Sequence, residues 1–259
     1  MGNTQLAKSL PTNTPPPFFT KGHIMTKQNI KINSIPAVIY SGVKQDNDCG
    51  RLYLYIHGKM GFKEEAESFA ETVCPKGYKV LSIDLPEHGE RKSESGFVPW
   101  KVVPELKSVL GFAHEHCDSI FLRAVSIGAW FSLLAFADER FEKCLFLSPV
   151  TDMELLIKNM MTYANVTEEM LEQRKKIPTD MGETLDIEYY RYAQSHPITK
   201  WSSPTAILYG SNDILISRAA VTDFARRFDC TLTTAENCEH WFHTKEQLDI
   251  LRAWEEKRS

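Results

Sequence analysis

Short apolar runs alternate along this chain with longer segments in which apolar residues recur at helical spacing. The short runs are bounded by Gly, Pro, Asn, Asp or Ser, which is typical of strands. We expect strands at 30–32, 37–40, 51–56, 79–83, 120–122, 144–147, 205–209 and 231–234. Helical spacing predicts helices at 62–74, 102–113, 217–228 and 245–256, and a further helix directly after residue 126. In the last helix, Leu248, Leu251 and Trp254 are expected to face inward.

Strands that alternate with helices in this way imply right-handed βαβ crossovers, so the predicted fold class is α/β with a doubly wound, mostly parallel sheet. The first two strand segments are expected to form an antiparallel pair. Residues 27–150 and 201–259 are the two parts of this expected core. Residues 1–26 are expected to be a disordered N-terminal extension without a signal-peptide pattern, and Met25 is a candidate natural start.

The pattern changes between residues 151 and 200, where no strand is evident and helices are expected at 153–163, 167–175 and 187–195. We expect this segment to be a helical lid insertion. It holds five of the eight methionines and a group of tyrosines, namely Met153, Met160, Met161, Met170, Met181, Tyr163, Tyr189, Tyr190 and Tyr192. These side chains are either ordinary packing residues or the lining of an adaptable apolar pocket.

Composition and charge exclude several classes of protein. Hydrophobic residues at 42% and charged residues at 25% are values of a globular protein. A net charge of −4 gives no reason to expect nucleic-acid binding. No apolar run approaches the roughly 18 residues that a membrane span needs. The scattered cysteines, without a C-x-x-C pair, favour free thiols in a reducing cytoplasm; they are Cys49, Cys74, Cys117, Cys144, Cys230 and Cys238.

The segment 119–136 joins an apolar run to a helix rich in Ala, Leu and Phe through an abrupt transition at Ser126. The small residues Ala124 and Gly128 flank this serine at the spacing of the nucleophile elbow, G-x-S-x-G. Small neighbours let a strand and a helix approach across a sharp, strained turn. The alternative is that Ser126 is an ordinary helix N-cap.

Other polar clusters also follow directly after predicted strands. They are His57-Gly58, the loop from Asp84 to Gly89, Asp213 and His240. Because the carboxyl ends of parallel strands meet at one edge of a sheet, where active sites of this architecture gather, we interpret these clusters together.

Together with the Ser126 elbow, these clusters make five segments, in the chain order His57-Gly58, the loop 84–89, Ser126, Asp213 and His240. With the five segments in this order, the chain resembles the α/β-hydrolase superfamily over essentially everything after about residue 27. The order Ser, Asp, His is the one that this fold uses. Lidded carboxylesterases and monoacylglycerol-lipase-like enzymes are the most similar branch. The chain departs from the pattern at Ala124, where the elbow usually has its first glycine, and at Glu87, where a glycine is usual. Neither change removes a reacting atom.

The resemblance implies a catalytic triad in which Ser126 is the nucleophile, His240 the base and Asp213 the group that orients the imidazole. It also implies an oxyanion hole made by the backbone N–H groups of Lys59 and Ile127. Neither a cofactor nor a metal is implied. The candidate pocket residues are Met60, Met153, Met160, Tyr163 and Trp241.

Each assignment has an alternative. Asp213 could be a turn residue that caps the next helix, and His243 could replace His240 as the base. A metal pair of the two histidines lacks a third ligand nearby. His57 and His88 are expected to shape their loops, and the Lys59 side chain is expected to be solvated.

The sequence therefore predicts a cytoplasmic serine hydrolase that cleaves carboxylic esters of small to medium acyl groups through an acyl-enzyme intermediate. The alternatives are the same triad acting on a thioester, an amide or peptide, or a carbon–carbon bond, and a non-catalytic ligand-binding or scaffold protein. The expected partner is a small-molecule ester, with no nucleic acid and no membrane span, and homodimer formation is left open.

Overall fold

The computed structural model describes residues 25–42, 50–180 and 182–259. Within them an eight-stranded sheet has the order β1-β2-β4-β3-β5-β6-β9-β10. The strands are β1 (Met25–Ile32), β2 (Ile35–Gly42), β3 (Arg51–Ile56), β4 (Lys79–Ile83), β5 (Ser119–Val125), β6 (Cys144–Leu147), β9 (Thr205–Gly210) and β10 (Thr231–Ala235). Strand β2 pairs antiparallel with both β1 and β4, and every other pairing in this sheet is parallel. The predicted α/β class and the opening antiparallel pair are confirmed.

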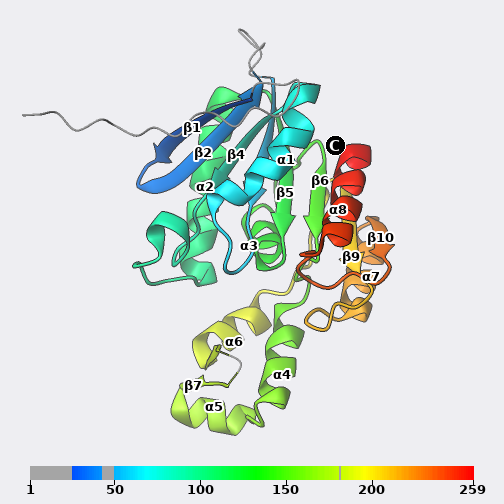
Figure 1. The fold of residues 1–259 in the computed structure, drawn as a ribbon. Helices are drawn as coiled ribbons and strands as arrows, with labels where there is room; N and C mark the ends of the chain where they lie inside the picture. Colours follow the sequence, from blue (N-terminus) through cyan, green and yellow to red (C-terminus); the bar gives the residue numbers. More distant parts are fainter. Residues whose placement is uncertain (1–24, 43–49, 181) are drawn as a thin grey trace, which may run out of the picture.

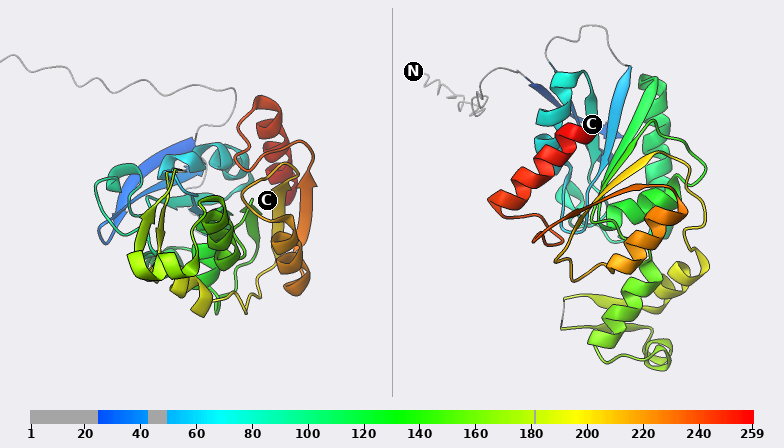
Figure 2. Two further views of the ribbon diagram at one scale, coloured as in Figure 1. Left: turned by 90° about the horizontal axis from the view of Figure 1, so that it is seen from below. Right: turned by 90° about the vertical axis from the view of Figure 1, so that its right-hand side faces the viewer.

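Helices cover both faces of the sheet, because alternate residues of the central strands are apolar on each side (Figure 2). On one face, Leu54 and Leu122 pack in a core with α2 (Pro99–His116), α3 (Ile127–Ala135) and α7 (Arg218–Arg227). On the other, Tyr53 and Leu145 pack with α1 (Ala66–Val73) and α8 (Lys245–Arg258). This two-sided burial explains the continuous apolar runs of the parallel strands.

Three short 3-10 helices adjoin these elements, at Lys63–Glu65, Cys74–Lys76 and Gly89–Arg91. The first two extend α1 at its ends, so the helix predicted at 62–74 consists of three consecutive pieces. Gly77 ends it in a left-handed conformation, with φ of 89°.

The segment between β6 and β9 forms a lobe beyond the carboxyl ends of the parallel strands (Figure 1). It contains α4 (Met153–Tyr163), α5 (Glu168–Arg174), β7 (Lys176–Pro178), β8 (Thr184–Asp186) and α6 (Ile187–Ser195). The expectation of an insertion without strands is wrong, because β7 and β8 pair antiparallel. Each strand is three residues long and Pro178 ends the first, so neither shows a readable alternation.

The apolar side chains of the insertion belong to the same continuous core as those of α2, α3 and α7. Met153, Met161, Leu171 and Tyr190 are buried, and Met160 and Met170 pack against them half-buried. These contacts support the packing interpretation for the methionines of the insertion, although Met153 also lines a cavity. Met181 lies outside the described residues.

The inward face of α8 agrees in part with the apolar pattern. Trp254 is buried, but Leu251 is half-buried and Leu248 is 47% exposed, so the prediction for Leu248 is wrong. Gln247 and Glu255 are buried instead. Both have polar partners inside the fold, the Asn237 carbonyl and the Arg123 guanidinium, and such partners cannot be seen from hydrophobic spacing.

Strand β1 begins at Met25, and the preceding residues of the predicted extension lie outside the described part, as does Cys49. No disulfide joins the cysteines within the described part of the chain. No helix in the ranges that the structure describes is long and apolar enough to cross a membrane.

Candidate active site

Ser126 occupies a strained turn between β5 and α3. Its backbone has φ of 50° and ψ of −121°, an uncommon conformation for a residue with a side chain. The Ser126 N–H donates to the Leu147 carbonyl at 2.9 Å, which fixes the turn against the neighbouring strand. Although Ser126 is the N-cap residue of α3, its side chain makes no capping hydrogen bond. The ordinary N-cap interpretation therefore does not describe this hydroxyl.

Gly128 lets α3 start directly against the end of β3. A Cβ atom at this position would lie 2.3 Å from the His57 carbonyl oxygen and 2.8 Å from that of Ile56. Ala124, by contrast, lies within β5 beside Ile56 and Phe146, with its side chain fully buried in the core. The elbow therefore needs its second glycine for close approach and accommodates alanine at the first position.

The structure brings together the side chains of Ser126, His240 and Asp213, which follow the ends of β5, β10 and β9. His240 Nε2 lies 2.9 Å from Ser126 Oγ, and His240 Nδ1 lies 2.7 Å from Asp213 Oδ2. The His240 and Asp213 side chains are only 6% and 0% exposed. Because a carboxylate only accepts hydrogen bonds, Nδ1 carries the proton and Nε2 is left to accept from the serine hydroxyl.

Asp213 also has the turn role considered as its alternative. Its second oxygen, Oδ1, accepts from the N–H groups of Leu215 and Ile216, both at 2.9 Å. One carboxylate thus closes its own loop with one oxygen and holds the imidazole with the other.

His243 is not placed at the serine. Its side chain is 59% exposed, and its Nδ1 lies 3.2 Å from a carboxylate oxygen of Glu239. Among the described residues, no group of three His, Cys, Asp or Glu side chains is arranged to hold a metal ion.

Two backbone N–H groups flank Ser126. Ile127 follows it at the start of α3, and the loop after β3 passes so close that a Cβ atom on Gly58 would lie 3.3 Å from Ser126 Cβ. The Lys59 N–H donates to no protein acceptor within the described chain, and Ile127 is the first residue of α3, where a backbone N–H has no partner inside the helix. Both are therefore available to a negatively charged oxygen beside the serine.

Two buried histidines fix the loop that carries Lys59. His88 accepts from the Met60 N–H at Nε2 and donates to the Pro86 carbonyl from Nδ1, at 2.9 and 2.8 Å. His57 accepts from the Leu85 N–H and donates to the Gly58 carbonyl, at 3.1 and 2.7 Å. Burial lowers the pKa of His57 to about 4, so its ring is neutral and can keep both bonds. The two rings shape these loops, which is the role that the sequence favoured for them.

The loop after β4 explains the departure at Glu87. This residue has φ of 69°, a conformation that favours glycine. Its carboxylate accepts from the N–H groups of Gly96 and Phe97, at 2.7 and 3.1 Å. Partial burial opposes ionisation, but these two hydrogen bonds prevail and lower the pKa of Glu87. The strain of the left-handed backbone is thus offset by contacts that a glycine could not make.

The candidate pocket residues are dispersed. Met60 and Trp241 are 85% and 60% exposed and directly adjoin Lys59 and His240 in the chain. Tyr163 is exposed at the carboxyl end of α4, and Met160 packs within the insertion.

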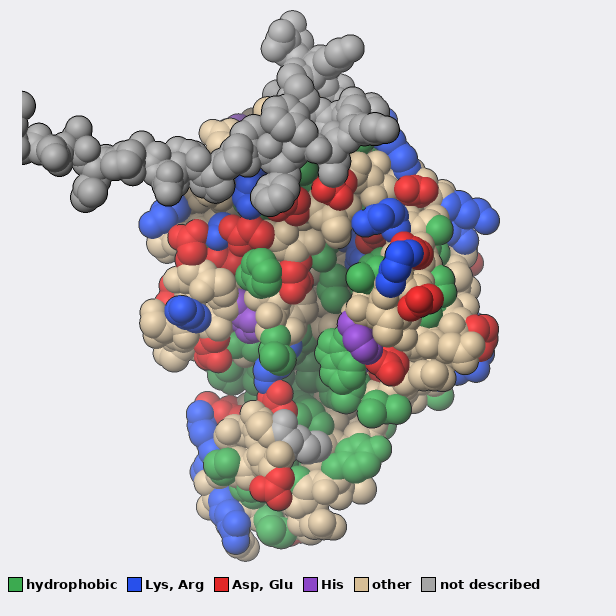
Figure 3. Space-filling view, viewed as in Figure 1, with side chains coloured by type: hydrophobic (Ala, Val, Ile, Leu, Met, Phe, Trp, Pro, Cys, Tyr) green, Lys and Arg blue, Asp and Glu red, His purple; other side chains and the backbone are tan. Residues whose placement is uncertain are grey.

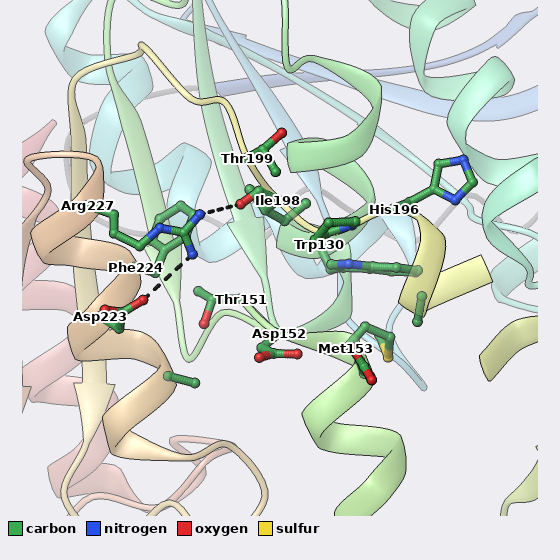
Figure 4. Close-up of a pocket in the computed structure, with 14 residues that line it drawn as sticks. Trp130, Thr151, Asp152, Met153, His196, Ile198, Thr199, Asp223, Phe224 and Arg227 are labelled. Carbon is green, nitrogen blue, oxygen red and sulfur yellow. Dashed lines mark hydrogen bonds and ion pairs between the residues drawn. The ribbon is translucent and has the colours of Figure 1, made fainter. Parts of the chain in front are cut away.

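Met153 lines a cavity of about 160 Å³ at the junction of the insertion and the core (Figure 4). Trp130 and Phe224 form part of its wall, together with Thr151 and Ile198. No residue of the Ser126–His240–Asp213 group lines this cavity. Trp130 follows Ser126 by one turn of α3 and is the wall residue nearest to it in the chain.

One contact at this site was not predicted from the sequence. The Lys59 ammonium pairs with the Glu183 carboxylate, which precedes β8 of the insertion. The Lys59 side chain is 45% exposed, as expected for a solvated lysine, but its ammonium also has this charged partner. A separation of 124 residues leaves no local signal for this ion pair.

Solved structures similar to this chain establish its fold. Est1E from Butyrivibrio proteoclasticus is 20% identical, with a TM-score of 0.72 over 89% of this chain and 96% of Est1E. Mouse alpha/beta hydrolase domain-containing protein 10 is 14% identical, with a TM-score of 0.65 over 88% and 96% of the two chains. The Pyrococcus furiosus esterase Pf2001 is 16% identical, with a TM-score of 0.59 over 90% and 88%.

No family model matches the chain, and comparison with curated proteins finds no relative. The structural matches show that the protein has the α/β-hydrolase fold, as the sequence resemblance implied.

Proposed function

We propose that this protein is a serine hydrolase that cleaves carboxylic esters of small to medium acyl groups through an acyl-enzyme intermediate. The observation that carries the proposal is the continuous hydrogen-bonded series from Ser126 through His240 to Asp213. A serine hydroxyl is a poor nucleophile until a neighbouring base accepts its proton. This arrangement supplies the base and also orients it.

In the proposed reaction, Ser126 Oγ attacks the ester carbonyl carbon while His240 Nε2 accepts the hydroxyl proton. The negative charge on the carbonyl oxygen is stabilised by the N–H groups of Lys59 and Ile127. His240 then gives its proton to the leaving alcohol as the carbon–oxygen bond breaks. Water attacks the acyl-serine in the same way, so the acid is released and the serine regenerated. Apart from the ester and the water, every step uses only groups of this chain.

Two structural relatives support an ester as the substrate. One structure of Est1E holds ferulic acid, a carboxylic acid, and the Pyrococcus furiosus protein is named an esterase. The insertion at 151–200 would serve as a lid, since it lies beyond the carboxyl ends of the parallel strands. We place the reaction in the cytoplasm, in keeping with the scattered cysteines.

Turnover of p-nitrophenyl acetate and butyrate tests the proposal. Ser126→Ala should lower kcat by at least about 10⁴-fold, because neither the base nor the orienting carboxylate can act without the nucleophile. His243→Ala is the control and should keep the wild-type rate. Activity that survives in Ser126→Ala would contradict the assignment. A panel with matched thioesters and amides then identifies the bond that is cleaved fastest.

A further inference from the structure

The ion pair between Lys59 and Glu183 connects the core to the insertion beside the candidate active site. Lys59 follows Gly58, which borders Ser126, whereas Glu183 lies between the strands of the β7–β8 hairpin. The surface is hollowed between the core and the insertion, and apolar side chains gather on the walls of this hollow (Figure 3). The pair therefore joins the insertion to the loop that borders Ser126.

The two partners differ in how firmly they are held. The loop of Lys59 is closed by the Gly61 N–H, which donates to the Gly58 carbonyl, and is fixed by His88 through the Met60 N–H. The hairpin belongs to a lobe that rejoins the core through the segments around Thr151 and Ile198. The attraction of the pair therefore acts mainly on the position of the hairpin and much less on the loop.

Large apolar side chains are exposed directly next to the residues of the candidate site. Met60 adjoins Lys59, Trp241 adjoins His240, and Ile214 follows Asp213; their exposures are 85%, 60% and 80%. An extended apolar acyl group would find its contacts on this surface.

We propose that Glu183 is a specificity-determining residue. By pairing with Lys59 it holds the β7–β8 hairpin across the access to Ser126 and thereby disfavours long or bulky acyl groups. The inference rests on the proposed function in naming the acyl group, but the closure of the hairpin can be measured without any turnover.

The expected size of the effect follows from the exposure of the pair. The side chains of Lys59 and Glu183 are 45% and 35% exposed, so water and salt weaken their attraction. Removing such a pair should increase the opening of the hairpin by about two- to fivefold.

Hydrogen–deuterium exchange of peptides that contain β7 and β8 measures this opening. We expect exchange in Glu183→Gln to be about two- to fivefold faster than in the wild type. Glu172→Gln is the matched control, because Glu172 pairs with Lys175 and Arg191 inside the insertion and does not bridge to the core. The charge-swapped double variant K59E/E183K should restore the wild-type exchange rate. Equal exchange in Glu183→Gln, Glu172→Gln and the wild type would overturn the inference.

A kinetic comparison tests the consequence for specificity. The ratio of kcat/KM for p-nitrophenyl octanoate to that for p-nitrophenyl acetate should rise about two- to fivefold in Glu183→Gln and stay constant in Glu172→Gln. Raising the salt concentration should increase this ratio in the wild type but not in Glu183→Gln. An unchanged ratio in an active Glu183→Gln enzyme overturns the specificity claim. Failure of the proposed function is distinct from this result, because the wild type would then turn over neither ester.

Discussion

At the residue scale, the single carboxylate of Asp213 has two hydrogen-bonding roles. Oδ2 accepts a hydrogen bond from His240 Nδ1–H, while Oδ1 holds the turn that leads towards α7. The catalytic and the structural interpretation of this residue are therefore compatible, and a substitution can separate them.

Asp213→Asn should keep the fold and lose activity. The amide oxygen can still accept from the Leu215 and Ile216 N–H groups, but its NH₂ group would face His240 Nδ1. The imidazole would then carry its proton on Nε2 and could not accept from Ser126. We expect kcat to fall about 10⁴-fold at an unchanged melting temperature. Ester turnover and thermal unfolding measured on the same sample check this, and a melting temperature far below the wild type would contradict the separation of roles.

His57 should make the fold sensitive to mild acid. Its pKa is lowered to about 4 by burial, against about 6.5 in an unfolded chain. A depressed pKa in the folded state gives stability that is fully present above pH 6.5 and is lost as the pH falls towards 4. The loss from this one group is about 2 kcal/mol at pH 5.

Histidine NMR titration tests this prediction directly. The His57 ring resonances should stay constant between pH 7 and pH 5, because burial lowers the pKa of this ring to about 4. Titration of His57 near pH 6.5 would show that its hydrogen bonds to Leu85 and Gly58 do not keep the ring neutral.

At the residue scale, local motifs in the sequence were enough to select three side chains that lie together in the fold. Ser126, Asp213 and His240 follow predicted strands, and the structure places them within hydrogen-bonding distance. Sequence reasoning failed for Glu183, because nothing near that residue in the chain indicates contact with Lys59. The candidate pocket residues were chosen by side-chain type, and the structure disperses them because type alone does not give a position.

At the scale of elements, the approach of α3 to β3 positions the elbow. Gly128 is the point of closest contact, and the atoms facing it are backbone carbonyls that cannot rotate away. Any side chain there must push the helix from the strand and move the Ser126 and Ile127 N–H groups with it.

Gly128→Ala should therefore destabilise the protein by about 1–3 kcal/mol and also lower its activity. Gly111→Ala on α2 is the matched control, since a Cβ atom there meets nothing within 4 Å. Because Gly111 lies inside an exposed part of the helix, its substitution should stabilise by about 0.5–1 kcal/mol. Urea denaturation of both variants measures the two effects, and an equal response of the two glycines would be inconsistent with the close approach.

The boundaries of several elements agree with their prediction, and the reasons are local. Strands β3, β4 and β6 are apolar runs bounded by polar or turn residues, so the run and the strand coincide. On α8, Trp254 and Leu251 pack inward as predicted, but Leu248 is exposed, and the polar residues Gln247 and Glu255 are buried with partners. The β7–β8 hairpin was missed because three-residue strands have no measurable period.

At the scale of the whole molecule, a buried ion pair connects the central strand to the end of the chain. Arg123 on β5 is 1% exposed and donates from Nε and Nη2 to Glu255 Oε1 of α8, at 2.9 and 2.8 Å. Strand β5 leads into Ser126, so this contact fixes the last helix against the strand that carries the candidate nucleophile.

Glu255→Gln should cost about 3–5 kcal/mol of stability, because it leaves the Arg123 charge buried without its counter-charge. The neighbouring Glu256→Gln is the control, since Glu256 is exposed and its change should stay within about 0.5 kcal/mol. The double variant R123M/E255M should recover most of the loss. Chemical unfolding of the three variants measures this, and a small effect of Glu255→Gln would mean that water reaches the guanidinium.

The overall architecture was predictable because it follows from the alternation of strands and helices along the whole chain. Each apolar run must be buried on both faces, and right-handed crossovers leave few ways to arrange the strands. The internal arrangement of the insertion was less predictable. Its helices, such as Met153–Tyr163 and Ile187–Ser195, show clear periodicity, but their docking depends on contacts between distant residues such as Lys59 and Glu183.

The central claim is that Ser126 is an activated nucleophile, and fluorophosphonate labelling followed by peptide mass mapping tests it most directly. The folded protein should carry the label on Ser126 alone. Ser126→Ala should carry none, and Asp213→Asn should be labelled far more slowly. Folded wild-type protein that remains unlabelled by probes of increasing length, or label on another serine, would contradict the account.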